Sequence, residues 1–127
     1  MDGLLDKIKT SLTEIAKDEE APMEAVYYGI MNDAEIENWN YFVFNRAVTT
    51  RRDGATFNER FQINIIHEDY IPEGYEMKVM KKVCEDCNLR MAAGPDITFN
   101  YSMKPNTRQV VEIATITLVR SNKMEAI

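Results

Sequence analysis

Histidine and cysteine are scarce in this sequence, which has one histidine, His67, and two cysteines, Cys84 and Cys87, among 127 residues. A single imidazole limits Ser/His and Cys/His nucleophilic schemes to one possible base. A structural zinc needs a full tetrahedral ligand set, which one cysteine pair and one histidine cannot complete unless subunits share the metal. Extracellular disulfide frameworks normally have more cysteines, spread along the chain. We therefore expect no metal, no cofactor and a reducing compartment.

Long apolar runs are also absent. No stretch approaches the roughly 18 consecutive apolar residues that span a bilayer, and the start of the chain, residues 1–4, lacks the basic and apolar regions of a signal peptide. The net charge of −6 argues against general nucleic-acid binding, because clustered lysine and arginine supply the affinity for phosphate. Isolated glycines form no phosphate-cradling loop; they are Gly29, Gly54, Gly74 and Gly94. These absences predict a cytoplasmic protein with no membrane or nucleic-acid partner.

The few residues that suggest chemistry have simpler interpretations. Cys84-Glu85-Asp86-Cys87 has the spacing of thiol oxidoreductases, but a redox pair lies at a helix N-terminus, where the helix dipole lowers the thiol pKa. Here the pair lies late in a predicted helix, beside two acids that raise the thiol pKa, which favours small packing residues. His67-Glu68-Asp69 is typical of a solvated turn, with a catalytic or metal role as the alternative. Because no pair of carboxylates stands out either, we predict no catalytic residue and no enzyme.

Two segments have the periodicity of amphipathic helices. In residues 2–18 the apolar positions fall on one face, and Pro22 prevents the helix from continuing. A second helix follows Pro72, and the residues from Asn88 to Pro95 close it. Its apolar side consists of Tyr75, Val79, Met80, Val83, Cys84 and Cys87.

The remaining segments are predicted strands. The clearest is the one in which Phe57, Phe61, Ile63 and Ile65 alternate with Asn58, Arg60, Gln62 and Asn64, because a period of two over this length is hard to reconcile with a helix. Asp53-Gly54 before it predicts a tight hairpin. A half-buried strand is expected from the alternation of Ile97, Phe99, Tyr101 and Met103 with polar residues. The strand over 39–50 has aromatics on both faces, namely Trp39, Tyr41, Phe42 and Phe44, which indicates either cover by a helix and a loop or an oligomer interface.

The element order α-β-β-β-α-β-β predicts a single α+β domain over residues 1–127. Short turns join most consecutive strands, so we expect a mainly antiparallel sheet with two helices packed on one face. Residues 121–127 are expected to form a frayed tail. The strands over 39–50 and 108–120 are long enough to extend beyond the helices and to leave surface for a neighbouring subunit.

Charge is distributed unevenly along the chain. Residues 1–38 have a net charge of −7, whereas residues 39–66 have a net charge of +2. The basic residues of the second segment gather around the predicted hairpin; they are Arg46, Arg51, Arg52 and Arg60. They are either a solubilising loop or a contact for an acidic patch on a neighbouring subunit, because arginine suits directed, bidentate contacts. In the second case, the acidic helices of one subunit meet the hairpin of the next, and a head-to-tail ring is favoured.

The architecture resembles that of the tail-terminator and tail-completion proteins of long-tailed bacteriophages, and head–tail joining proteins are similar. The resemblance covers nearly the whole chain, although no sequence motif carries it. Its elements are the opening amphipathic helix from Leu4 to Ala16, the hairpin through Arg51-Arg52-Asp53-Gly54, the helix after Pro72, and the closing hairpin through Lys104-Pro105-Asn106.

This resemblance implies a ring, typically of six subunits, that docks on the end of the tail tube. Such a ring stops tube polymerisation and offers a surface to the head connector. The implied partners are copies of the chain itself and other tail-tube and head-completion proteins. The implied location is the cytoplasm of the bacterial host during assembly and the virion tail afterwards.

Two other classes of function stay open. The first is a small cytoplasmic α+β ligand-binding or enzymatic domain with a pocket between helix and sheet, and the second is a binding module for a host protein. A ring or concentration-dependent association favours the structural protein. A strict monomer with a deep polar pocket, or with tightly bound metal, favours the enzyme.

Overall fold

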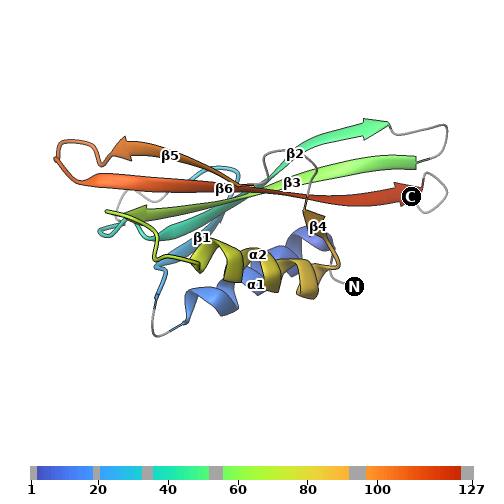
Figure 1. Ribbon diagram of the computed structural model, residues 1–127, viewed down its shortest axis with the longest axis horizontal. Coiled ribbons are helices and arrows are strands. Elements are labelled where there is room, and N and C mark those ends of the chain that lie inside the picture. Colours follow the sequence, from blue (N-terminus) through green and yellow to red (C-terminus); the bar gives the residue numbers. More distant parts are fainter. Residues whose placement is uncertain (1–2, 19–20, 33–35, 52–55, 92–96, 124–127) are drawn as a thin grey trace.

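The computed structural model of the chain describes residues 3–18, 21–32, 36–51, 56–91 and 97–123. These residues form a single α+β domain with the predicted element order, to which one very short strand is added. The helices are α1 (Leu4–Ala16) and α2 (Tyr75–Cys87), and the strands are β1 (Ala25–Tyr28), β2 (Tyr41–Arg51), β3 (Thr56–Glu68), β4 (Arg90–Met91), β5 (Ile97–Met103) and β6 (Val110–Lys123). Both helices lie on one face of a long twisted sheet (Figure 1). Neither of them is long and apolar enough to cross a membrane.

Three long strands form the centre of the sheet. The strand order is β1-β2-β3-β6-β4, and β5 pairs with β6 beyond the short β4. The β2–β3, β3–β6, β4–β6 and β5–β6 pairs are antiparallel, which confirms the predicted sheet type. The β1–β2 pair is the exception and is parallel. Two parallel neighbours need a connection that brings the chain back to the end where the first strand began, and residues 29–40 lie between β1 and β2 in the sequence.

The main core lies between this sheet and the two helices. The predicted alternation in β3 is confirmed, because Phe61, Ile63 and Ile65 are buried on the helix-covered face, which we call the helix side. Burial of each such side chain stabilises the fold by about 1.5–3 kcal/mol. The largest side chains that are fully buried there come from both layers: Ile8, Leu12, Phe42, Ile63, Ile65, Val79, Val83, Ile116 and Leu118.

Polar contacts fix the two helices against each other. Ser11, which is buried, donates a hydrogen bond to Asp86 Oδ2 at 2.8 Å. Lys82 Nζ lies 2.9 Å from Glu14 Oε2 and 2.8 Å from Asp86 Oδ2. The helix α2 ends at the predicted place, because Asn88 adopts the left-handed conformation, with φ of 55°, that commonly terminates helices.

The other face of the sheet, opposite the helices, has an apolar end and a polar middle. Tyr41, Val43, Ile66 and Val111 form a second buried cluster, covered by side chains that include Tyr27, Met31, Ile36 and Trp39. Residues of the same chain thus cover the aromatic side chains on both faces of β2. This agrees with the interpretation that a helix and a loop bury them. The polar middle is a hydrogen-bonded row of Asn45, Gln62, Asn64 and Thr115.

One prediction needs correction, and parts of others fall outside the described residues. The strand β6 runs to Lys123 and pairs with β3 as far as Thr56, so residues 121–123 are not part of a frayed tail. Residues 124–127, the hairpin turn Asp53-Gly54, and Arg52 lie outside the described residues. The register of β2 against β3 shifts by one residue between Arg46 and Val48, as in a β-bulge.

Candidate functional site

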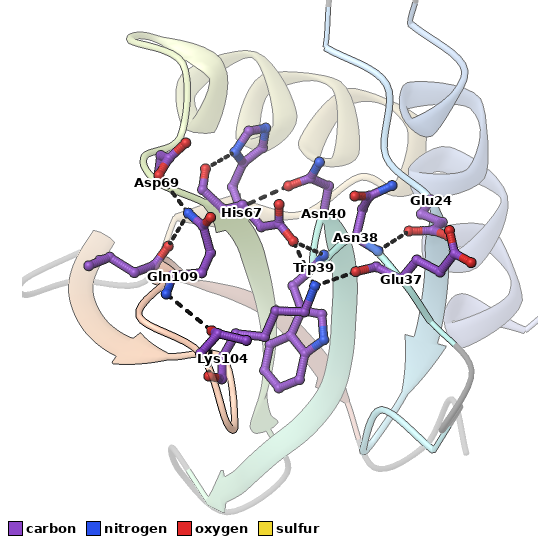
Figure 2. Close-up of polar contacts among 12 residues, drawn as sticks. Glu24, Glu37, Asn38, Trp39, Asn40, His67, Asp69, Lys104 and Gln109 are labelled. Carbon is purple, nitrogen blue, oxygen red and sulfur yellow. Dashed lines mark hydrogen bonds and ion pairs between the residues drawn. The ribbon is translucent and has the colours of Figure 1, made fainter.

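Polar groups from three separate segments meet where β3 ends (Figure 2). The ammonium group of Lys104, in the turn between β5 and β6, lies 3.1 Å from Glu68 Oε1. The same oxygen accepts a hydrogen bond of 3.0 Å from the backbone N–H of Trp39. Lys104 also donates to the backbone oxygen of Glu37. We call Glu37, Trp39, Asn40, Glu68 and Lys104 the sheet-end cluster.

Neighbouring residues extend this cluster along the backbone. The Asn40 side-chain oxygen accepts a hydrogen bond of 3.0 Å from the Glu68 N–H. Asp69, in the left-handed conformation with φ of 65°, donates its N–H to the Val110 oxygen at 2.8 Å. Gln109 Nε2 donates to Asp69 Oδ1 at 2.6 Å. The prediction of a solvated turn is therefore wrong for Glu68, whose side chain is only 21% exposed and has defined partners.

The electrostatics of the sheet-end cluster keep Glu68 ionised. The hydrogen bond from the Trp39 N–H, followed by the hydrogen bond and charge of Lys104, lowers the pKa of Glu68 below its ordinary value of 4.5. His67 Nδ1 lies 2.8 Å from the Glu68 backbone oxygen. Among the residues that the structure describes, no three His, Cys, Asp or Glu side chains are arranged to hold a metal ion. The cluster is thus built to hold the segment before β2 against the β5–β6 turn.

Replacing Glu68 by glutamine tests this role. We expect Glu68→Gln to lower the free energy of unfolding at pH 7 by about 1 kcal/mol, since a partly exposed charged hydrogen bond is lost. A lowered folded-state pKa stabilises the fold above about pH 5, and this contribution disappears as the pH falls through that pKa. The difference between variant and wild type should therefore shrink in urea titrations below pH 4. Glu85→Gln, at an exposed glutamate of α2, is the control, and an equal loss there would contradict the assignment.

Two hollows lie near candidate residues. An open cavity of about 580 Å³ adjoins the sheet-end cluster and is lined by polar residues that include Asp69, Arg108 and Gln109. A second hollow, of about 370 Å³, lies between the start of α1 and the sheet, where the ligand-binding alternative expects a pocket. Its lining includes Leu4, Leu5 and Phe61 together with an ion pair, Arg120 Nη2 to Glu59 Oε2 at 2.9 Å.

The two cysteines are packing residues of α2. Cys87 is 5% exposed and belongs to the main core, and Cys84 packs against that core at half-burial. Burial, together with the charge of Asp86, raises the pKa of Cys87 to about 11. Burial and Glu85 also raise the pKa of Cys84. Both thiols are therefore protonated at neutral pH, which is the reverse of what a redox pair needs.

The three hairpin arginines that the structure describes, Arg46, Arg51 and Arg60, do not form one patch. The partners of Arg46 and Arg51 on β3 are Phe61 and Phe57, so both arginines lie on the helix side of the sheet. Arg60 directly precedes Phe61 in β3, so it lies on the opposite face of the sheet, where it is half-buried. Arg46 and Arg51 are exposed, and Arg46 Nε donates to the Tyr28 hydroxyl at 3.1 Å. The structure thus brings two of the four predicted residues together on one face.

Two stretches of strand lie at an open edge of the sheet within the part of the chain that the structure describes. The strand β1 covers β2 only from Tyr41 to Phe44, so its pairing ends before residues 45–51. The strand β5 pairs with β6 alone, and its other side faces no strand. Figure 1 shows these stretches, which we call the free edges, at opposite ends of the sheet, beyond the helices. Because unpaired edges invite pairing with another chain, they are the leading candidates for a functional surface.

The prediction that β5 is half-buried is wrong. Phe99, Tyr101 and Met103 are 43%, 66% and 53% exposed, because the helices end before this part of the sheet (Figure 1). Only Ile97 packs against the main core. The sheet-end cluster was missed as well, because Glu68 and Lys104 are far apart in sequence and no local pattern links them.

The sequence matches no protein-family model and no curated protein. The free edges and the sheet-end cluster are therefore assigned from the geometry and charge of this chain, and no residue role is carried over to them.

Proposed function

We propose that this chain is a structural assembly protein, the subunit of a ring that terminates or completes the tail of a long-tailed bacteriophage and joins it to the head. The observation that carries the proposal is the pair of free edges, β2 residues 45–51 and β5, on opposite sides of one sheet. A subunit with different contact surfaces on its two sides associates head to tail. Such contacts close into a ring when the rotation between subunits allows it.

The charges of the two edges support head-to-tail contact. The β2 edge carries Arg46 and Arg51, whereas β5 carries no charged residue. Next to β5 the carboxylate of Glu112 is hydrogen-bonded to the Tyr101 hydroxyl. Two β2 edges would place arginines opposite each other, and like charges in paired strands are destabilising. Unlike edges avoid this repulsion.

The architecture supports the specific assignment to phage tails. An opening helix, a first hairpin made by β2 and β3, a second helix, and a closing hairpin made by β5 and β6 are the features of the resemblance. The implied ring has six subunits, contacts the tail tube on one side and head-completion proteins on the other, and is found in the virion after assembly in the host cytoplasm.

Size-exclusion chromatography with light scattering tests the proposal directly. The purified chain should form a species of defined mass, whose share increases with concentration and which negative-stain electron microscopy shows as a ring. A strict monomer at every concentration up to about millimolar, the range in which weak contacts still associate, would refute it.

Charge reversal at the β2 edge should weaken the ring. For Arg46→Glu with Arg51→Glu we expect the association constant to fall by at least about tenfold, because charges at an interface set partner choice and association. Thermal stability should change little, because both side chains are exposed. The matched control is Lys78→Glu with Lys81→Glu on exposed positions of α2. Equal weakening by both pairs would indicate a general effect of net charge.

A small-molecule function is the second candidate, and one observation favours it. The hollow between α1 and the sheet combines apolar residues, Leu4, Leu5 and Phe61, with a charged pair at Glu59 and Arg120. Native mass spectrometry of the purified chain would detect a retained ligand. A monomer that carries one would favour this candidate over the ring.

A further inference from the structure

We infer that the free edge of β5 in one copy pairs with β2 residues 45–51 of the next copy, so that one continuous antiparallel sheet runs through the assembly. This inference rests on the proposed ring and identifies the contact that builds it. The partner surface is a second copy of the chain, and the recognition is main-chain hydrogen bonding between strands, with side chains that determine which edges match.

The strand β5 is an unprotected edge. Proteins normally protect exposed edges with lysine, proline, bulges or very short strands. The seven residues of β5, Ile97–Met103, include no charged residue and no proline, and their pairing with β6 is regular throughout. Three of their four helix-side side chains, Phe99, Tyr101 and Met103, are exposed hydrophobics, and Val110 beside them is also 43% exposed. An edge of this kind favours pairing with another strand.

The β2 edge is selective. It carries two arginines and a register shift at Ala47, which hinder pairing with a copy of itself. Beyond the shift, residues 48–51 pair regularly with β3 and present an ordinary strand edge. A neutral strand with a nearby carboxylate suits this edge, and β5 with Glu112 provides both.

Strand directions make the contact possible without turning a subunit over. The β2–β3, β3–β6 and β6–β5 pairs are all antiparallel, so β5 and β2 run in opposite directions. Two copies with their helices on the same side therefore bring β5 and β2 together as an antiparallel pair. Residues 45–51 of β2 equal the seven residues of β5 in number, and four of them, residues 48–51, lie beyond the register shift.

The same arrangement places complementary charges on one face. Arg46 and Arg51 lie on the helix side of β2, because their register partners are Phe61 and Phe57. Tyr101 lies on the helix side of β5, opposite Glu112 of β6. The arginines of one copy thus face the Tyr101–Glu112 pair of its neighbour. Pairing of β5 with a second β5 lacks this match of charges. It also occupies the same edge in both copies, so the assembly would stop at a closed dimer.

Engineered disulfides test the contact. Thr50 of β2 and three β5 residues, Thr98, Asn100 and Ser102, all lie on the face opposite the helices, since their register partners are Asn58, Thr115, Ile113 and Val111. Thr50→Cys would be combined with Thr98→Cys, Asn100→Cys or Ser102→Cys in turn, which samples neighbouring registers. After mild oxidation, we expect at least one pair to give a ladder of covalent oligomers on a non-reducing gel.

Controls separate this contact from others. Thr50→Cys with Thr117→Cys places the second thiol on the same face of an interior strand, β6, and should give no ladder. The wild-type chain under the same oxidant reports on Cys84 and Cys87. A band that stops at the dimer for Asn100→Cys alone would show β5–β5 pairing and overturn the inference.

Light scattering on the same variants before oxidation separates a failure of the β5–β2 contact from a failure of the proposed ring. Rings without a ladder from any of the three pairs would refute the β5–β2 contact and leave the proposed function intact. Monomers without a ladder, in variants and wild type alike, would refute the proposed ring together with its contact. A ladder that ends at the subunit number measured by light scattering would support both.

Discussion

Replacing Phe42 by alanine should lower the free energy of unfolding by about 3–5 kcal/mol. The side chain is 0% exposed, and it lies between the sheet and the two helices. Its ring is stacked on Tyr75 of α2, with centroids 6.4 Å apart. Alanine removes this contact and leaves a cavity that the surrounding strands cannot close. Urea denaturation followed by circular dichroism measures the loss.

A phenylalanine in the same sheet provides the control. Phe99 of β5 is 43% exposed, so Phe99→Ala should cost less than about 1 kcal/mol. Association raises apparent stability by mass action, and both variants must therefore be compared at one low protein concentration. Equal losses at Phe42 and Phe99 would mean that β5 is covered in the folded subunit, which would also remove the main reason to regard it as a free edge.

The central strands and helices were predictable because burial imposes a period on their residues. The alternation through Phe61, Ile63 and Ile65 matches the buried face of β3, and the apolar positions of residues 4–15 match the buried face of α1. The direction of β1 was not predictable from its own residues, because it depends on the path of the connection to β2. The strand β4 has only two residues, too few for any period.

The free edges show where a sequence pattern stops being informative. Alternation in β5 shows that its two faces differ, but it does not reveal how far the helices extend over the sheet. The exposed stripe of Phe99, Tyr101 and Met103 therefore looks the same in sequence as a buried one. The same reasoning applies to the hairpin arginines, which are close in sequence but divided between two faces by the alternation of side chains.

The sheet-end cluster explains how the β5–β6 hairpin keeps its position beyond the helices. Lys104 joins the turn of that hairpin to Glu68 of β3 and to the segment before β2. A hairpin held in this way presents β5 as a preformed edge, and a preformed edge loses less conformational entropy on binding. Glu68→Gln should therefore weaken assembly as well as folding, a link that no local sequence pattern indicates.

A lysine in the middle of β5 should nearly abolish assembly. Tyr101 is 66% exposed, so the fold tolerates Tyr101→Lys, but the new charge lies beside Glu112, on the face that the arginines of the neighbouring copy are proposed to contact. Like charges at an interface cost several kcal/mol, and we expect the dissociation constant for assembly to rise by about 100-fold. Light scattering over a concentration series measures it. Tyr70→Lys, at a tyrosine 68% exposed and outside the strands, is the control and should have little effect.

A combined variant shows whether this loss comes from the proposed contact or from local damage. If the lysine introduced by Tyr101→Lys repels Arg46 and Arg51 of the next copy, then adding Arg46→Glu and Arg51→Glu to the same chain replaces repulsion by attraction. The combined variant should therefore assemble better than either parent, a departure from additivity that only interacting sites show. Additive losses would mean that the two edges act separately. That outcome would contradict the β5–β2 contact.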